Sequence, residues 1–152
     1  MMASIMALLP VTALWMPSIL SLDVGTKTIG VARAYTTGPR IATPMLTLRR
    51  KSVKKDAAAI AELCRKHDAS AVVVGLPLEE DGGEGRPVRL ARQVGGAVGE
   101  LTGLPVHYQD ERYSTLEASR RLSAQGMDAR RQKSVIDQAA AAVILEDWLG
   151  AQ

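Results

Sequence analysis

The chain has 152 residues, of which 47% are hydrophobic and 23% are charged, a balance typical of a globular domain with a sizeable core. It has no Phe and only three Tyr and two Trp, which argues against a single-strand-binding protein built on aromatic stacking platforms. The formal net charge of +3 is too small to identify a partner, and the single cysteine, Cys64, excludes an internal disulfide and fits a reducing, cytoplasmic compartment.

The first fifteen residues have a composition of their own. They are largely apolar, but the stretch is too short to span a membrane and lacks the basic start of a signal peptide. Pro10 would interrupt a helix there. We therefore expect residues 1–15 to be an extension outside the core and residues 16–152 to form one domain. A short accessory helix docked on the core is the alternative.

A hairpin is expected at the start of the domain. SILSLDV (18–24) and TIGVARAY (28–35) are both typical of strands, so Gly25-Thr26-Lys27 is expected to form the turn between them. A phosphate-binding P-loop would lead into a helix and contain Gly-Lys-Ser/Thr, and this turn does neither. Asp23 is therefore a carboxylate at the end of a hydrophobic strand, a costly placement unless a cation or hydrogen-bond donors compensate it.

The rest of the pattern predicts βα units. A third strand at 40–50 is followed by alternating helices and strands, with a glycine-rich loop at 79–85 and a basic loop at 126–133. The expected helices are 52–67, 87–103, 114 to about 125 and 134–149, and the expected strands are 70–78 and 104–112. STLE (114–117) matches a capping box, which predicts a helix start at Ser114. Three antiparallel strands followed by βα units give an α/β fold, a mixed five-stranded sheet flanked by helices.

Carboxylates occur at three places that such a sheet brings together. Asp110 and Glu111 end the expected strand 104–112, and Asp137 lies on the apolar face of the last helix. The strand carrying Asp23 is central in this topology, and ligands bind beyond the carboxyl ends of its parallel neighbours. Converging carboxylates repel one another unless a cation lies among them, and oxygen ligands suit Mg²⁺ or Mn²⁺. Singly, each acid has a structural alternative: an ion pair for Asp110 or Glu111, and a charge near a helix N-terminus for Asp137.

Basic residues form two clusters in the sequence. The first lies within 49–55 and the second runs from Arg112 to Lys133. A phosphate-contacting surface and solvated helix faces explain such clusters equally well, so charge alone does not decide between them.

Four strings carry a resemblance to a known family. LDVGTKTIGVA, VVGLPL, DERYST and IDQAAAAVIL are similar, in this order, to motifs of the YqgF/RuvX family of Holliday junction resolvases and pre-ribosomal-RNA nucleases, which has a ribonuclease H-like fold. The resemblance covers residues 18–149. The family's acidic residues correspond to Asp23, the Asp110-Glu111 pair and Asp137. The departures are the extension 1–15 and Tyr113, where an aliphatic residue is expected.

The resemblance implies a divalent-metal-dependent endonuclease that processes the 5′ end of pre-16S rRNA, resolves Holliday junctions, or both. Two Mg²⁺ or Mn²⁺ ions would activate water and stabilise the leaving oxygen. Asp23 would bridge both ions, and Glu111 and Asp137 would hold one each. Asp110 competes with Glu111 as the ligand or orients neighbouring groups. The basic residues expected to contact the nucleic acid are Lys27, Arg112, Arg130, Arg131 and Lys133.

Two other function classes remain open at this point. Asp-x-Gly-Thr before a strand also resembles the first phosphate motif of the actin and sugar-kinase superfamily, but those phosphotransferases close two such domains around a nucleotide. A non-catalytic RNA- or ribosome-binding module would keep the fold without using its costly carboxylates. We expect no membrane partner, and the sequence leaves a homodimer open.

Overall fold

The computed structural model describes residues 16–152, so the predicted extension 1–15 lies outside the described residues. In chain order the elements are β1 (Ser18–Val24), β2 (Thr28–Tyr35), β3 (Thr43–Arg49), α2 (Val53–Lys66), β4 (Ala69–Leu76), α3 (Arg86–Thr102), β5 (Val106–Asp110), α4 (Ser114–Ala124) and α5 (Ala129–Gly150). The five expected strands are all present.

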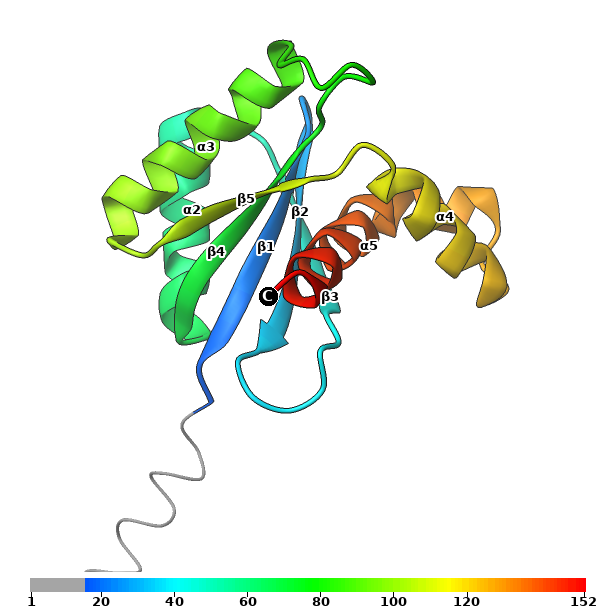
Figure 1. Cartoon of the computed structure of the whole chain (residues 1–152), viewed down its shortest axis with the longest axis horizontal. Helices are drawn as coiled ribbons and strands as arrows, with labels where there is room; N and C mark the ends of the chain where they lie inside the picture. The colour runs from blue at the N-terminus through cyan, green and yellow to red at the C-terminus, as the bar shows by residue number, and fades with distance from the viewer. Residues whose placement is uncertain (1–15) are drawn as a thin grey trace, which may run out of the picture.

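The strands form one mixed sheet in the order β3-β2-β1-β4-β5. β2 pairs antiparallel with both β1 and β3, whereas β4 pairs parallel with β1 and with β5. This arrangement confirms the predicted topology, with β1 at the centre. Helices α2 and α3 cover one face and α5 crosses the other, with α4 packed beside α5 (Figure 1).

Alternation along β1 decides which residues face which helices. Leu20 and Leu22 are fully buried in the core between the sheet and the helices α2 and α3. Ser21 points to the opposite face, where its hydroxyl donates a hydrogen bond to the Ala141 carbonyl of α5, with 2.6 Å between the oxygens. Because side chains alternate along a strand, Asp23 lies on the same face as Ser21. The carboxylate at the end of β1 therefore faces α5.

One predicted helix start is wrong, and one predicted helix cap does not form although its helix begins at Ser114 as expected. The expected loop 126–133 is partly helical, because Asp128 caps α5 by accepting a hydrogen bond from the Arg131 amide (2.9 Å) and strong helix formers follow it. The expected capping box at 114–117 does not form. Tyr113 is the N-cap of α4 and makes no side-chain cap, while the Ser114 hydroxyl bonds to Glu111 instead.

Two further observations concern the environment of the chain. Within residues 16–152, no helix is both long and apolar enough to cross a membrane. Cys64 is buried in the core as a free thiol, and burial raises its pKa to about 11. A thiol that stays protonated at neutral pH is a poor nucleophile, so Cys64 has a packing role.

Candidate active site

Asp23 lies near the carboxyl end of the central strand, where it pairs in register with Gly30 of β2. Its side chain is partly buried, and no described residue gives it a hydrogen bond. Burial, followed by the charges of Glu111 and Asp137, raises the pKa of Asp23 from 3.8 to about 8. A buried carboxylate next to two other negative charges is stabilised either by protonation or by a cation bound at its oxygens.

Glu111 follows directly after β5 and is buried. Its backbone amide donates to the Leu76 carbonyl at the end of β4 (3.0 Å), which extends the pairing of these strands by one residue. The Ser114 hydroxyl donates to Glu111 Oε2 (2.5 Å). Burial raises the pKa of Glu111, the hydrogen bond from Ser114 lowers it, and the Asp110 charge raises it. Ser114, three residues along, therefore helps to hold this carboxylate.

Asp137 is brought to the site by the close approach of α5 to β2. A Cβ atom added to Gly30 would lie 2.0 Å from the Asp137 carbonyl oxygen, so only glycine allows the helix to lie at this distance. The Thr28 hydroxyl donates to Asp137 Oδ2. Since α5 begins at Ala129, Asp137 is more than two turns inside the helix and receives little stabilisation from its N-terminal dipole. The alternative explanation of Asp137, a charge near a helix N-terminus, is therefore wrong.

These three carboxylates line one open pocket of about 320 Å³. The pocket lies between the β1–β2 hairpin, the start of α3, the end of β5 and α5, and its other lining residues include Thr26, Pro87 and Leu90. Among residues 16–152, no three His, Cys, Asp or Glu side chains lie close enough together to surround one ion. The three acids share one pocket, and Glu111 and Asp137 each accept a hydrogen bond from a hydroxyl group.

Asp110 does not line this pocket. Its carboxylate is exposed and pairs with Arg112, whose Nη2 lies 2.8 Å and whose Nε lies 2.9 Å from Oδ2. This ion pair lowers the pKa of Asp110, the opposite direction to the shift at Glu111. The two adjacent acids therefore have different environments. Of the two, Asp110 is the one that forms an ion pair, the structural alternative that the sequence left open for either acid.

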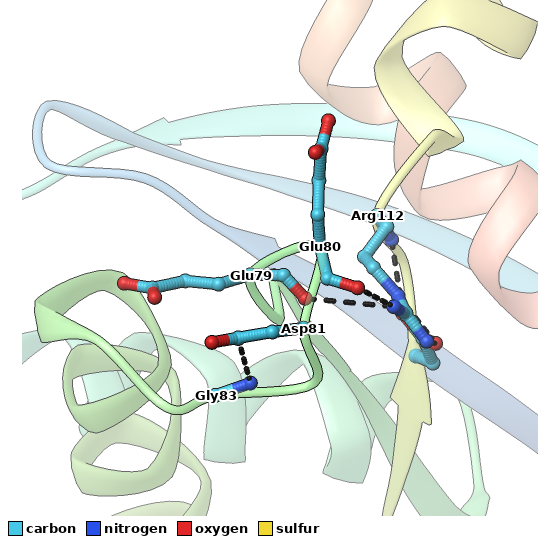
Figure 2. Close-up of polar contacts among 6 residues, drawn as sticks. Glu79, Glu80, Asp81, Gly83 and Arg112 are labelled. Carbon is cyan, nitrogen blue, oxygen red and sulfur yellow. Dashed lines mark hydrogen bonds and ion pairs between the residues drawn. The ribbon is translucent and has the colours of Figure 1, made fainter.

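Arg112 connects the end of β5 to the acidic loop that follows β4. Its Nη1 donates to the Glu80 carbonyl (3.0 Å) and lies 3.5 Å from the Glu79 carbonyl oxygen. Figure 2 shows that these two carbonyls face Arg112 while the Glu79 and Glu80 side chains point away from it. Arg112 also lines the carboxylate pocket, but much of its hydrogen-bonding capacity is used within the protein.

The other predicted phosphate-binding residues lie outside the pocket. Lys27 is exposed at the hairpin turn. Arg130, Arg131 and Lys133 are exposed on the first turns of α5, four to seven residues before Asp137, or about 6–10 Å along the helix axis. None of the four lines the pocket, so their contact with substrate stays a prediction.

Sequence reasoning missed the two hydroxyls that hold the acids. Ser114 lies three residues after Glu111, but the same letters also fit a capping box, and that interpretation is wrong. Thr28 is the first residue of β2, two positions before the Gly30 that pairs with Asp23, and only the docking of α5 brings it to Asp137. Its role depends on tertiary structure and has no local signal.

Comparison with known proteins identifies relatives along nearly the whole described chain. A family model described as "RuvX: Holliday junction resolvase" matches residues 17–151. A protein of Anaeromyxobacter dehalogenans named "Putative pre-16S rRNA nuclease" is 44% identical over 130 residues, covering 86% of this chain and 94% of the relative. One of Myxococcus xanthus with the same name is 42% identical over 132 residues, covering 87% of each chain.

Solved structures show the same fold at low sequence identity. The RuvC structure of Thermus thermophilus superimposes with a TM-score of 0.56 at 17% identity, covering 88% of this chain and 96% of that chain. The fowlpox virus resolvase, solved with Holliday junction DNA, gives a TM-score of 0.52 at 10% identity over 87% of this chain and 98% of that one. The likeness to RuvC confirms the predicted ribonuclease H-like fold.

Proposed function

Since this chain belongs to the RuvX family, we propose that it is an endonuclease that hydrolyses phosphodiester bonds of nucleic acid at the carboxylate pocket. The observation that carries this proposal is the meeting of Asp23, Glu111 and Asp137 from three separate elements at one open pocket. Their burial and mutual repulsion, expressed in the raised pKa of Asp23, would be relieved by a cation. A purely structural or RNA-binding role gives these carboxylates no use.

The donor set suits Mg²⁺ or Mn²⁺, which prefer carboxylate oxygens. The Asp23 side chain has no hydrogen-bond partner among the described residues, and together with Glu111 and Asp137 it would hold the metal ions. In this arrangement two ions would share the three acids, so three acids need not surround any one ion. The ion pair between Asp110 and Arg112 supports Glu111 as the ligand and gives Asp110 an orienting role. When bound, such ions would activate water and stabilise charge on the leaving oxygen.

The residues around the acids keep them in place. Ser114 and Thr28 hold Glu111 and Asp137 through their hydroxyls, so both carboxylates have defined positions on either side of Asp23. Arg112 fixes the acidic loop at the edge of the pocket and lies where a phosphate would approach. Lys27, Arg130, Arg131 and Lys133 are the further candidates for phosphate contacts.

The relatives' names suggest two substrates, precursor 16S rRNA and the Holliday junction, and both present the same phosphodiester chemistry. We propose that the enzyme acts in the cytoplasm, on the 5′ end of pre-16S rRNA, on branched DNA, or on both. A homodimer would suit the two-fold symmetry of a four-way junction.

The test is a single-turnover cleavage assay with purified protein on both substrates, in Mg²⁺, in Mn²⁺ and in excess chelator. We expect metal-dependent cleavage by the wild type and by Glu62→Gln, a charge-neutralising control on the exposed surface of α2, and none by Asp23→Asn. Cleavage that persists in chelator would contradict the metal mechanism. Wild-type binding of RNA without cleavage under every condition would favour the non-catalytic module instead.

A further inference from the structure

A second pocket lies beside the carboxylate pocket and is lined by several arginines. Its lining residues are Thr26, Arg50, Arg86, Pro87, Arg89, Leu90 and Gln93; we refer to it as the arginine pocket. Thr26, Pro87 and Leu90 line both pockets, which are therefore contiguous. In Figure 1 the β1–β2 hairpin and the start of α3 lie at the same end of the sheet.

The three arginines differ in how much of their charge is available. Arg50 is mostly buried, forms an ion pair with Asp56 (3.0 Å) and donates to the Gly25 carbonyl, so it supports the hairpin. Arg86 and Arg89 are exposed, and neither side chain has an ion-pair or hydrogen-bond partner within residues 16–152. These two guanidinium groups can therefore bind an external anion.

Acidic side chains of the loop before α3, including Glu79 beside Gly85, lie near the arginine pocket but do not line it. No lining residue of the pocket is acidic, and the first turn of α3 contains no acid. The nearby Glu84 is held by Arg92 through two hydrogen bonds of 2.8 Å. The loop acid Asp81 accepts a hydrogen bond from the Gly83 amide (2.7 Å), as Figure 2 shows. The pocket is thus a positive surface next to a negative one.

Helical spacing places the two arginines in a row. Residues 86, 89 and 93 follow i, i+3, i+7 spacing and lie on one face of α3, so Arg86, Arg89 and Gln93 lie side by side along the pocket. Pro87 and Leu90 supply apolar surface between them and the carboxylates. A chain of phosphates could follow this row and continue into the carboxylate pocket.

We propose that the arginine pocket binds the phosphodiester backbone of the substrate next to the cleavage site, with Arg86 and Arg89 each contacting a phosphate. This inference rests on the proposed nuclease function and extends the substrate surface to the α3 side of the carboxylates, opposite the basic start of α5. Phosphate contacts set position and affinity and carry no base sequence information. The ligand is therefore the backbone common to RNA and DNA.

The test measures how binding depends on salt, without divalent metal so that cleavage plays no part. Fluorescence anisotropy gives Kd for labelled RNA and DNA strands of one sequence, between about 50 and 200 mM NaCl. Arg86→Ala/Arg89→Ala is compared with Arg65→Ala/Lys66→Ala, which removes the same charge from the exposed last turn of α2. Circular dichroism melts check that each variant is folded. Comparing the single variants Arg89→Glu and Arg89→Ala adds an independent measurement of charge reversal.

For two lost phosphate contacts, the slope of log Kd against log[salt] should fall by about 1.4 on single strands. We expect this decrease with both RNA and DNA, a larger loss of affinity for Arg89→Glu than for Arg89→Ala, and an unchanged slope for the Arg65/Lys66 control. A slope equal to that of the control would overturn the arginine pocket while leaving the nuclease proposal intact. A decrease with RNA alone would show that the two arginines do not contact a backbone common to RNA and DNA, and would contradict the proposal. A wild type that binds neither strand would overturn the arginine pocket, whereas the nuclease proposal is decided separately by the cleavage assay in Mg²⁺ or Mn²⁺.

Discussion

Neutralising Asp23 should stabilise the metal-free protein. The folded state binds the Asp23 proton more tightly than the unfolded state, because burial and the charges of Glu111 and Asp137 raise the pKa from 3.8 to about 8. Stability is therefore lost as the pH rises from about 4 to about 8. At pH 7 the pH exceeds the unfolded pKa by about 3.2 units, which at 1.36 kcal/mol per unit corresponds to about 4 kcal/mol. This is an upper limit, since water in the open pocket screens the charge.

The assay is thermal unfolding of wild type and Asp23→Asn in chelator at several pH values. About 2–4 kcal/mol corresponds to a rise in Tm of about 6–12 °C for Asp23→Asn at pH 7, using about 3 °C per kcal/mol for a domain of this size. The difference should shrink towards zero near pH 4, where Asp23 is protonated in the folded state. Asp110→Asn is the matched comparison: its ion pair with Arg112 lowers its pKa, so its neutralisation should lower Tm slightly above pH 4.

Neutralising Asp23 and neutralising Asp110 should therefore shift Tm in opposite directions, although both carboxylates lie at the same edge of the sheet. A Tm for Asp23→Asn at or below that of wild type at pH 7 would show that Asp23 is neither desolvated nor repelled by its neighbours. An increase that persists unchanged down to pH 4 would also refute the argument, because it could not come from ionisation. Either result would remove the physical basis for a cation at this pocket.

Two further predictions concern Asp137 and the first fifteen residues. Asp137→Asn should abolish cleavage and most of the rise in Tm that Mg²⁺ gives. The metal-free Tm should stay unchanged or rise, because reduced repulsion of Asp23 offsets a weaker hydrogen bond from Thr28. A variant that still cleaves and still responds to Mg²⁺ would show that Asp137 has only a structural role. Removing residues 1–15 should leave Tm and cleavage unchanged, since β1 begins at Ser18 and the family match at residue 17; a marked fall in Tm would show that these residues pack on the core.

The sheet was predictable because its signals are local and agree with one another. The strings around Asp23 give two strands and a turn, and apolar runs followed by helical spacing give the parallel part of the sheet. The start of α5 was missed because Asp128 lies among basic residues that are equally common in loops, although Asp at an N-cap followed by Ala and Arg is itself a helix signal.

The candidate site was only partly predictable, because some of its features depend on contacts between distant residues. The positions of Asp23, Glu111 and Asp137 followed from the topology. The pairing of Asp110 with Arg112 did not, since their spacing also allowed either acid to face the pocket. The arginine pocket combines Arg50 with residues of α3. The sequence gives no indication that Arg50 is neutralised by Asp56 while Arg86 and Arg89 have no ion-pair partner within residues 16–152.

The close contact of α5 with Gly30 also has a consequence for the newly made protein. Asp137 follows Asp23 by 114 positions in the chain (137 minus 23), and at about 5–20 residues per second the ribosome needs about 6–23 s to add them. During this interval Asp23 has no Asp137 beside it, because only the docking of α5 over Gly30 brings that carboxylate to the pocket. On the proposed mechanism, a growing chain cannot cleave the RNA around it. Synthesis itself delays activity until the helix has been made and packed.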